Sequence, residues 1–216
     1  VMERALYNTV LGGMALDGKH FFYVNPLEVH PKTLTFNHIY DHVKPVRQRW
    51  FGCACCPPNI ARVLTSLGHY IYTVRQDALF INLYVGNDVV IPVGDETLAL
   101  RISGNYPWHE QVKIEITSPV PVTHTLALRL PDWCAAPGVS LNGEDTTGEI
   151  SRGYLYLTQN WQEGDVVTLT LPMPVCRVYG NPQVRQQAGK VALQRGPLVY
   201  CLEEADNGAN LHNLSL

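Results

Sequence analysis

The chain has 216 residues, of which 46% are hydrophobic, so it is long enough to bury a core in one large domain or two small ones. Its formal net charge of −3 argues against nucleic acid as a partner, and no apolar run approaches the length that spans a membrane. Six cysteines are too few for a disulfide scaffold in a chain of this length. They fit a reducing, cytoplasmic compartment, although an extracellular location stays open.

The first segment, residues 1–18, carries apolar residues at helical spacing from Leu6 to Met14. This pattern predicts an amphipathic helix that ends at the glycines 12 and 13 or at Gly18. No signal peptide is apparent, and the chain starts on Val1 inside a helical pattern. We therefore expect it to be a fragment of a longer protein.

The next segments lack a helical period. Residues 21–27 are aromatic and β-branched and predict a strand or an extended loop that ends in a turn at Asn25-Pro26. Residues 28–50 are rich in His, Pro and charge, and a loop of that length in a compact domain is usually functional or disordered. It leads directly into a cluster of thiols.

The thiol motif is Cys53-Ala54-Cys55-Cys56-Pro57-Pro58-Asn59. Because Pro57 disfavours helical geometry at the residue before it, we expect the thiols to form a stiff, non-helical corner. Apolar residues at helical spacing from Ile60 to Ile71 then predict a helix over residues 59–75, capped by the Asn59 side chain, with one buried stripe.

Thiols just ahead of a helix N-terminus feel its positive end, which favours the thiolate and so favours metal ligation or nucleophilic attack. The competing interpretation is a pair of buried structural cysteines. A zinc site needs about four N, S or O ligands, and C-x-C-C is not a zinc-finger spacing. Further ligands would have to come from residues distant in the sequence, and the candidates in this part of the chain are Glu3, Glu28, His30, His38 and His42.

After the helix the pattern changes to short strands. Residues 79–85 and 89–93 predict two strands joined by a hairpin turn at Gly86-Asn87-Asp88. Strands are also predicted at 97–102, 111–117, 124–130, 139–143, 153–157 and 166–171, and one or two more at 189–202. Regular short strands separated by turns indicate a β-sandwich of about eight strands. We expect a division into residues 1–75, 76–175 and 176–216.

Other motifs in the sequence indicate less about function than the thiol motif does. Trp108 and Trp133 have the chemistry to stack on a sugar, but packing in a core or between domains is the simpler interpretation. The sequence contains no G-x-S-x-G motif of a serine hydrolase and no phosphate-binding glycine loop.

Several runs together resemble the bacterial β-L-arabinofuranosidases of glycoside hydrolase family 127. They include Met2-Glu3-Arg4-Ala5-Leu6-Tyr7-Asn8, the run from Phe21 to Glu28, the thiol motif with the preceding Trp50-Phe51-Gly52, Asn105-Tyr106-Pro107-Trp108 and Gln194-Arg195-Gly196-Pro197. The resemblance implies an α+β, mainly β chain: the last helices of an (α/α)6 barrel, an antiparallel β-sandwich and the start of a further β domain. It also implies a zinc-dependent, retaining glycosidase that releases L-arabinose from β-L-arabinofuranosides.

The same resemblance implies roles for single residues. Cys55 would be the nucleophile, Cys55 and Cys56 would both bind Zn²⁺, and Glu3 and Tyr23 would line the sugar pocket. Cys53 matches no assigned role. The family takes its other zinc ligands, a Glu-x-Cys pair, and its acid/base Glu from upstream helices, and residues 1–54 contain no Glu-x-Cys.

We therefore expect an upstream barrel segment to complete the site and the isolated chain to be inactive. Apolar helix faces left exposed by a partial barrel would favour self-association. The alternative to the enzyme hypothesis is a non-catalytic carbohydrate-binding or structural β-sandwich module.

Overall fold

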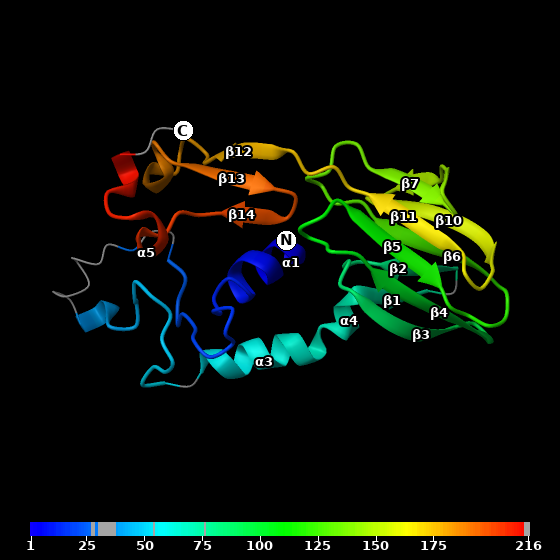
Figure 1. Ribbon diagram of the computed structural model, residues 1–216, viewed down its shortest axis with the longest axis horizontal. Helices are drawn as coiled ribbons and strands as arrows, with labels where there is room; N and C mark the ends of the chain where they lie inside the picture. The colour runs from blue at the N-terminus through cyan, green and yellow to red at the C-terminus, as the bar shows by residue number, and fades with distance from the viewer. Residues whose placement is uncertain (27–28, 30–37, 54, 76, 214–216) are drawn as a thin grey trace. The chain divides into compact units, whose positions relative to one another are not determined.

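The computed structural model describes residues 1–26, 29, 38–53, 55–75 and 77–213 (Figure 1). The chain forms two compact units, one of residues 65–174 and one that joins residues 1–64 to 175–216. The division of the sequence into residues 1–75, 76–175 and 176–216 refers to the domains of a longer protein and stays a prediction.

The unit of residues 65–174 is built from two sheets (Figure 1). The first has the strand order β1-β2-β6-β10-β9, with β1 Tyr72–Val74, β2 Ala78–Ile81, β6 Val122–Arg129, β10 Tyr154–Trp161 and β9 Glu149–Ser151. The second has the order β3-β4-β5-β11-β7-β8, with β3 Asn87–Val93, β4 Glu96–Ser103, β5 Gln111–Ile116, β11 Val166–Thr170, β7 Gly138–Leu141 and β8 Glu144–Asp145. The predicted β-sandwich is confirmed, but in the described residues its two sheets have eleven strands instead of about eight, and β2 pairs with β6 in parallel where an antiparallel sandwich was expected.

Alternation along the strands builds the core of this unit. In β5, for example, Val112, Ile114 and Ile116 are fully buried while the residues between them face outward. All members of the main buried hydrophobic cluster lie between Leu79 and Leu171. Trp161 is fully buried, and its indole N–H donates to the carbonyl of His124 at 2.9 Å. Unit 65–174 therefore has a core of its own.

The hairpin predicted at Gly86-Asn87-Asp88 is wrong. β2 and β3 belong to different sheets: β2 pairs in parallel with β6, and β3 pairs with β4. The tight turn of the latter hairpin contains Gly94, whose φ of +65° suits glycine. Of the two strands that flank β2, β1 is adjacent in the sequence, but β6 is more than 40 residues away, so no local turn signal could have identified the pairing with β6.

The observed helix begins three residues before the predicted range of 59–75 and ends four residues before the end of that range. α3 runs from Cys56–Ser66 and α4 from Gly68–Ile71. Tyr72 is already extended and opens β1, which pairs with β2. The predicted buried stripe is also wrong for α3: none of its residues is buried, and Leu64 is 40% exposed. The spacing of the apolar residues correctly predicted a helix, but these residues become buried only where another part of the protein packs against them.

The other unit begins with the predicted helix. α1 (Met2–Arg4) continues directly into the π-helical turn η1 (Ala5–Val10), with Leu6 buried. It ends before Gly12, as expected. A Cβ at Gly12 would lie 2.3 Å from the carbonyl oxygen of Asn8, so only glycine fits this close turn.

A three-stranded sheet completes this unit: β12 (Val175–Tyr179), β13 (Val191–Arg195) and β14 (Leu198–Tyr200). The predicted strands within 189–202 are confirmed, whereas β12 was not predicted. Asn8 joins the sheet to the helix, because its side-chain amide donates to the carbonyl of Pro197 at 2.8 Å and accepts from the N–H of Val199 at 2.7 Å. Short helices η3 (Arg185–Gln187), α5 (Glu204–Asn207) and η4 (Leu211–Asn213) accompany it.

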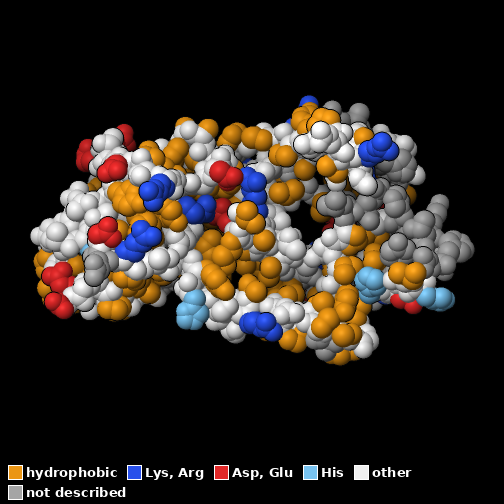
Figure 2. All heavy atoms as spheres, turned by 180° about the vertical axis from the view of Figure 1, so that it is seen from behind, with side chains coloured by type: hydrophobic (Ala, Val, Ile, Leu, Met, Phe, Trp, Pro, Cys, Tyr) orange, Lys and Arg blue, Asp and Glu red, His pale blue; other side chains and the backbone are white. Residues whose placement is uncertain are grey.

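The surface mixes side chains of all kinds. The face seen in Figure 2 carries hydrophobic side chains interspersed with charged ones of both signs. Exposed hydrophobic residues include Leu64 of α3 and Val178, Tyr179 and Tyr200 of the three-stranded sheet. Within the described residues, no helix is long and apolar enough to cross a membrane.

Candidate active site

The thiols lie at the start of α3. Cys55 is the residue before the helix, and Cys56 is its first residue. The expected non-helical corner is thus wrong for Cys56. Pro57 and Pro58 lie in the first turn, where the missing N–H of proline costs no intrahelical hydrogen bond. Asn59 is inside the helix and its amide donates to the carbonyl of Cys55 at 3.0 Å, so it does not cap the helix as predicted.

Tyr23 contacts two of the thiols. Its hydroxyl lies 3.0 Å from Cys55 Sγ, and the thiol of Cys56 donates to its backbone carbonyl at 3.5 Å. The sulfur atoms of Cys55 and Cys56 are 3.6 Å apart. The structure therefore brings together three of the four residues assigned to the site from the sequence. All of them belong to the unit of residues 1–64 and 175–216.

Aromatic packing holds Tyr23 in place. Its ring lies 5.4 Å from the ring of buried Phe51 and meets His42 edge-on at 5.8 Å. Phe21 exchanges two backbone hydrogen bonds of 2.9 Å with Gln48, which draws the segment before Tyr23 to the segment before the thiols. Phe51 had no assigned role in the sequence, and His42 was only a candidate metal ligand. The aromatic and β-branched composition of residues 21–27 did indicate an extended segment.

The hydrogen bond with Tyr23 changes the acidity of the thiols. It is the main reason why the pKa of Cys55 is lowered, with further hydrogen bonds from Cys56 and Cys53. The pKa of Tyr23 is raised for the same reason. Burial, followed by the neighbouring Cys55, raises the pKa of Cys56. Cys55 therefore ionises before Cys56, and it is exposed.

The domain descriptions of one enzyme family match nearly the whole chain. The β-L-arabinofuranosidase GH127 catalytic domain matches residues 1–69, the GH127 middle domain matches residues 78–173, and the glycoside hydrolase family 127 C-terminal domain matches residues 175–216. The chain belongs to glycoside hydrolase family 127.

Known members of family 127 agree with this assignment. A non-reducing end β-L-arabinofuranosidase of Bifidobacterium longum subsp. longum is 37% identical over 222 residues. A solved structure of a family 127 β-L-arabinofuranosidase from Geobacillus stearothermophilus T6 is 54% identical with a TM-score of 0.88 over 98% of this chain. A solved structure described as a family 127 β-arabinofuranosidase is 36% identical with a TM-score of 0.82 over 95% of this chain. The mainly β architecture described above is thus shared with family 127 structures.

The chain spans about a third of these family 127 relatives: 33% of the Bifidobacterium protein and 34% of the Geobacillus chain. The matched catalytic-domain segment contains the thiol cluster together with Tyr23 and Glu3. About two thirds of the length of these relatives lies outside the matched region.

The spacing of the thiols fits a zinc ion. Two sulfur ligands at about 2.3 Å from a tetrahedral zinc are about 3.8 Å apart, close to the 3.6 Å between Cys55 and Cys56. Within the described residues, however, no group of three or more His, Cys, Asp or Glu side chains has the arrangement of a metal site. Cys55 and Cys56 therefore offer two of the four ligands of a structural zinc site, or two of the three protein ligands of a catalytic one.

The remaining candidates fall in different places. Glu3 lies in α1 and is only 6% exposed. The His38 side chain is 97% exposed beside Asp41, which argues against a ligand role, and His42 contacts Tyr23. Glu28 and His30 lie outside the described residues.

The two tryptophans that were considered for sugar stacking differ in their exposure to solvent. Trp133 packs against the core, as the simpler interpretation held, whereas Trp108 is 57% exposed.

Proposed function

We propose that the cluster of Tyr23, Cys55 and Cys56 is the nucleophile centre of a retaining glycoside hydrolase that releases L-arabinose from β-L-arabinofuranosides. The observation that supports this most is the 3.0 Å contact between the Tyr23 hydroxyl and Cys55 Sγ in a family 127 chain. This contact favours the thiolate at Cys55 over the thiolate at Cys56. A thiolate is the reactive form of cysteine, and an exposed one is accessible to a substrate.

Cys55 and Cys56 are proposed as ligands of a zinc ion. Their sulfur separation of 3.6 Å supports this, and the remaining ligands are proposed to come from an upstream (α/α)6 barrel segment, of which α1, η1 and α3 would be the last helices. When bound, the zinc supplies positive charge that keeps both thiols deprotonated at neutral pH.

The proposed chemistry at Cys55 is a double displacement. The thiolate attacks the anomeric carbon, a carbon–sulfur bond forms as the glycosidic carbon–oxygen bond breaks, and the leaving oxygen takes a proton from an acid. Water then breaks the carbon–sulfur bond, gives its proton back to the same group and restores the anomeric configuration. That acid/base residue has no assigned position in this chain and is proposed to lie in the upstream segment.

Tyr23 and Glu3 are proposed to contact the sugar. The Tyr23 hydroxyl donates to the Cys55 thiolate in the resting site, and this holds the sulfur in one position for attack. Glu3 sits in the first helix with its carboxyl group largely shielded from water. A carboxylate in such a position is suited to accept hydrogen bonds from sugar hydroxyls.

The alternative is a non-catalytic carbohydrate-binding or structural sandwich. The β-sandwich of residues 65–174 has a complete core of its own and does not require the thiols. This alternative predicts that zinc binding and the thiols are unrelated to any effect on saccharides.

The test measures zinc content and hydrolysis of p-nitrophenyl β-L-arabinofuranoside. It compares the chain alone with a protein in which the upstream region found in the relatives precedes it, each with Cys55→Ser, Cys56→Ser, Cys53→Ser and Cys176→Ser. We expect the longer protein to bind one zinc, and Cys55→Ser to lower kcat by a factor of about 10³ or more. Cys176, an exposed thiol in β12, is the matched control and its loss should change neither value.

Two results would contradict the proposal. Full turnover in the longer protein without Cys55 would make the thiols structural, and substantial release of L-arabinose by the chain alone would show that no upstream segment is needed.

Two lesser proposals accompany it. The six free cysteines support a cytoplasmic location, which requires that all six thiols react with an alkylating agent when freshly isolated protein is unfolded in urea, because Cys134 is buried in the folded chain. The unburied apolar face of α3 supports self-association of the chain alone, which sedimentation velocity over a range of concentrations tests.

A further inference from the structure

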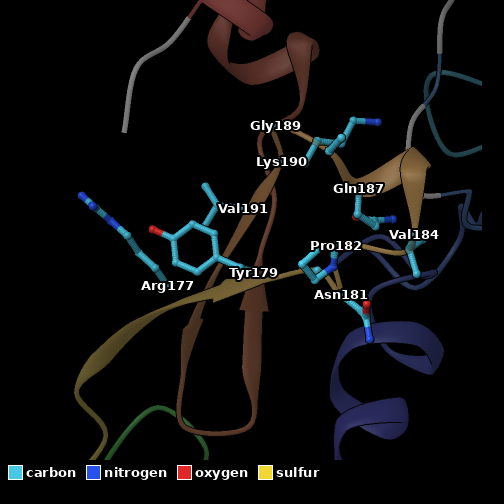
Figure 3. Close-up of a pocket in the computed structure, with 11 residues that line it drawn as sticks. Arg177, Tyr179, Asn181, Pro182, Val184, Gln187, Gly189, Lys190 and Val191 are labelled. Atoms are coloured by element: carbon cyan, nitrogen blue, oxygen red, sulfur yellow. The ribbon is translucent and has the colours of Figure 1, made fainter.

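A hollow of about 580 Å³ lies at the loop end of the β12–β13 hairpin. Its lining includes Arg177, Tyr179, Asn181, Gln187, Lys190 and Val191. Figure 3 shows Arg177, Tyr179 and Val191 on one side of the strands and Asn181, Pro182, Val184 and Gln187 on the other, with Lys190 above them. The volume is in the range of sites that hold a small ligand. None of these residues belongs to the thiol cluster.

The loop that forms the hollow is braced by its own backbone. Successive turns place hydrogen bonds from Val184 N to Asn181 O at 2.8 Å, from Gln187 N to Val184 O at 3.0 Å and from Lys190 N to Gln187 O at 3.1 Å. Gly180 allows Gln187 to approach closely, since a Cβ at position 180 would lie 2.6 Å from Gln187 Cβ. The shape therefore does not depend on the conformation of a single side chain.

The charge around the hollow is positive, in contrast to the chain as a whole. Residues 175–200 contain Arg177, Arg185, Lys190 and Arg195 and no Asp or Glu, although the whole chain has a net charge of −3. Arg177 and Lys190 line the hollow itself. A local field of this sign attracts anions.

An aromatic ring lies beside this positive charge. Tyr179 is 68% exposed, and because Arg177 is two residues earlier in the same strand, both side chains leave the sheet on the same face. An exposed ring next to a guanidinium presents an apolar face and a fork of N–H donors that matches a carboxylate. The side-chain amides of Asn181 and Gln187 add donors and acceptors for hydroxyl groups.

We propose that this hollow binds an acidic saccharide, with a uronate carboxylate on Arg177 and the sugar ring against Tyr179. A neutral sugar would leave the guanidinium without an anionic partner, and a simple inorganic anion would not use the aromatic face or the amides. The site would hold a uronate-containing glycan without taking part in bond cleavage, and it does not depend on the thiol chemistry.

The experiment is a titration of the whole chain with tetragalacturonate, followed by calorimetry at 50 mM salt. The comparison ligands are a neutral galactose tetramer, inorganic phosphate and polyglutamate. Arg177→Gln and Tyr179→Ser alter the hollow. Arg185→Gln is the matched control, because Arg185 carries the same charge in the same loop but does not line the hollow. Circular dichroism confirms that each variant keeps its fold, and both altered residues are exposed.

We expect tetragalacturonate to bind, the neutral tetramer not to bind, and Arg177→Gln and Tyr179→Ser each to weaken binding about tenfold. Arg185→Gln should leave the affinity within about twofold. The proposal is overturned if tetragalacturonate does not bind at millimolar concentration, or if the neutral tetramer binds equally well. It is also overturned if phosphate or polyglutamate binds as tightly, or if Arg185→Gln weakens binding as much as Arg177→Gln, because the attraction would then be a general one for anions.

Discussion

The hydroxyl of Tyr23 lies 3.0 Å from the sulfur of Cys55, a residue 32 positions later in the chain. The two side chains meet because Phe21 pairs with Gln48 through the backbone and Phe51 packs on the Tyr23 ring. This contact distinguishes Cys55 from Cys56, whose pKa is shifted in the opposite direction. Reactivity within the thiol motif is therefore set by a residue outside the motif.

Removing the Tyr23 hydroxyl should make Cys55 less acidic. In the metal-free chain, Tyr23→Phe removes the hydrogen bond that is the main cause of the lowered pKa of Cys55, so that pKa rises. With a higher pKa, a smaller fraction of Cys55 is thiolate near pH 7 than in the unmodified chain. Alkylation of Cys55 by iodoacetamide at this pH should therefore slow several-fold. Peptide mass spectrometry over a pH series measures this rate, with Cys201 as an exposed internal reference. Tyr70→Phe, at an exposed tyrosine of α4, should have no effect, and an unchanged Cys55 profile in Tyr23→Phe would contradict the assigned contact.

The bridge made by Asn8 should contribute measurably to stability. Asn8→Ala removes the side-chain hydrogen bonds to Arg4, Pro197 and Val199, and it leaves the partly buried carbonyl of Pro197 without this donor. We expect the free energy of unfolding of this unit to fall by about 1–3 kcal/mol. Urea unfolding measures the loss, and amide exchange at Val199 should become faster.

A local asparagine provides the control for this change. The Asn207 amide bonds only to the carbonyl of Glu203 in its own short helix, so Asn207→Ala should cost no more than about 0.5 kcal/mol. Equal losses in the two variants would show that the Asn8 bridge has no special role.

His124 should make the sandwich less stable in acid. Burial lowers its pKa, the charges of Asp77 and Glu96 oppose this shift, and its Nε2 is buried without a hydrogen-bond partner. Between the lowered folded pKa and the unfolded value of about 6.5, the unfolded chain binds more protons than the folded one. The stability contributed by neutral His124 is therefore complete above about pH 6.5 and is lost as the pH falls through the folded pKa.

The His124→Phe variant tests this dependence. It should retain more of its pH 7.5 stability at pH 5 than the unmodified chain does, as measured by urea unfolding at both pH values. His69→Phe replaces an exposed histidine and should leave the pH dependence as it was. Identical pH profiles for all three proteins would rule out His124 as the source.

The two units should differ in protection from hydrogen exchange. The sandwich has fully buried residues in β4, β5, β6 and β11, whereas the buried hydrophobic residues described in the other unit are Leu6, Val43, Phe51 and Leu198. Because local opening is easiest where few apolar contacts must be broken, amides of β5 and β6 should exchange most slowly. Exchange measured by mass spectrometry checks this, and equal protection of β13 and β5 would indicate one cooperative unit.

Local patterns in the sequence predicted the sandwich well. Short apolar and β-branched runs identified strands at 111–117 and 166–171, close to the observed β5 and β11. Their buried faces follow from the structure, in which every second side chain lies on the same side of the strand. The run from Val139 to Gly143 was predicted as a strand that leads into a hairpin. β7 ends at Leu141, and the chain turns at Asn142 and Gly143, whose positive φ values of 52° and 89° favour these residue types. The thiol motif, together with the other runs quoted above, also identified the family.

Pairings between distant segments could not be predicted in this way. The parallel alignment of β2 with β6, the edge strand β12 and the approach of Tyr23 to Cys55 all depend on which surfaces become buried together. The apolar spacing in α3 shows the same limit, since it specified a helix but not a partner for its apolar face. By itself the sequence determined most of the strands, the positions of the helices and the family, because these follow from φ/ψ preferences and side-chain chemistry. Only the tertiary structure decided the sheet order and which of Cys55 and Cys56 has the lowered pKa, because these follow from hydrogen bonds and packing between residues far apart in the chain.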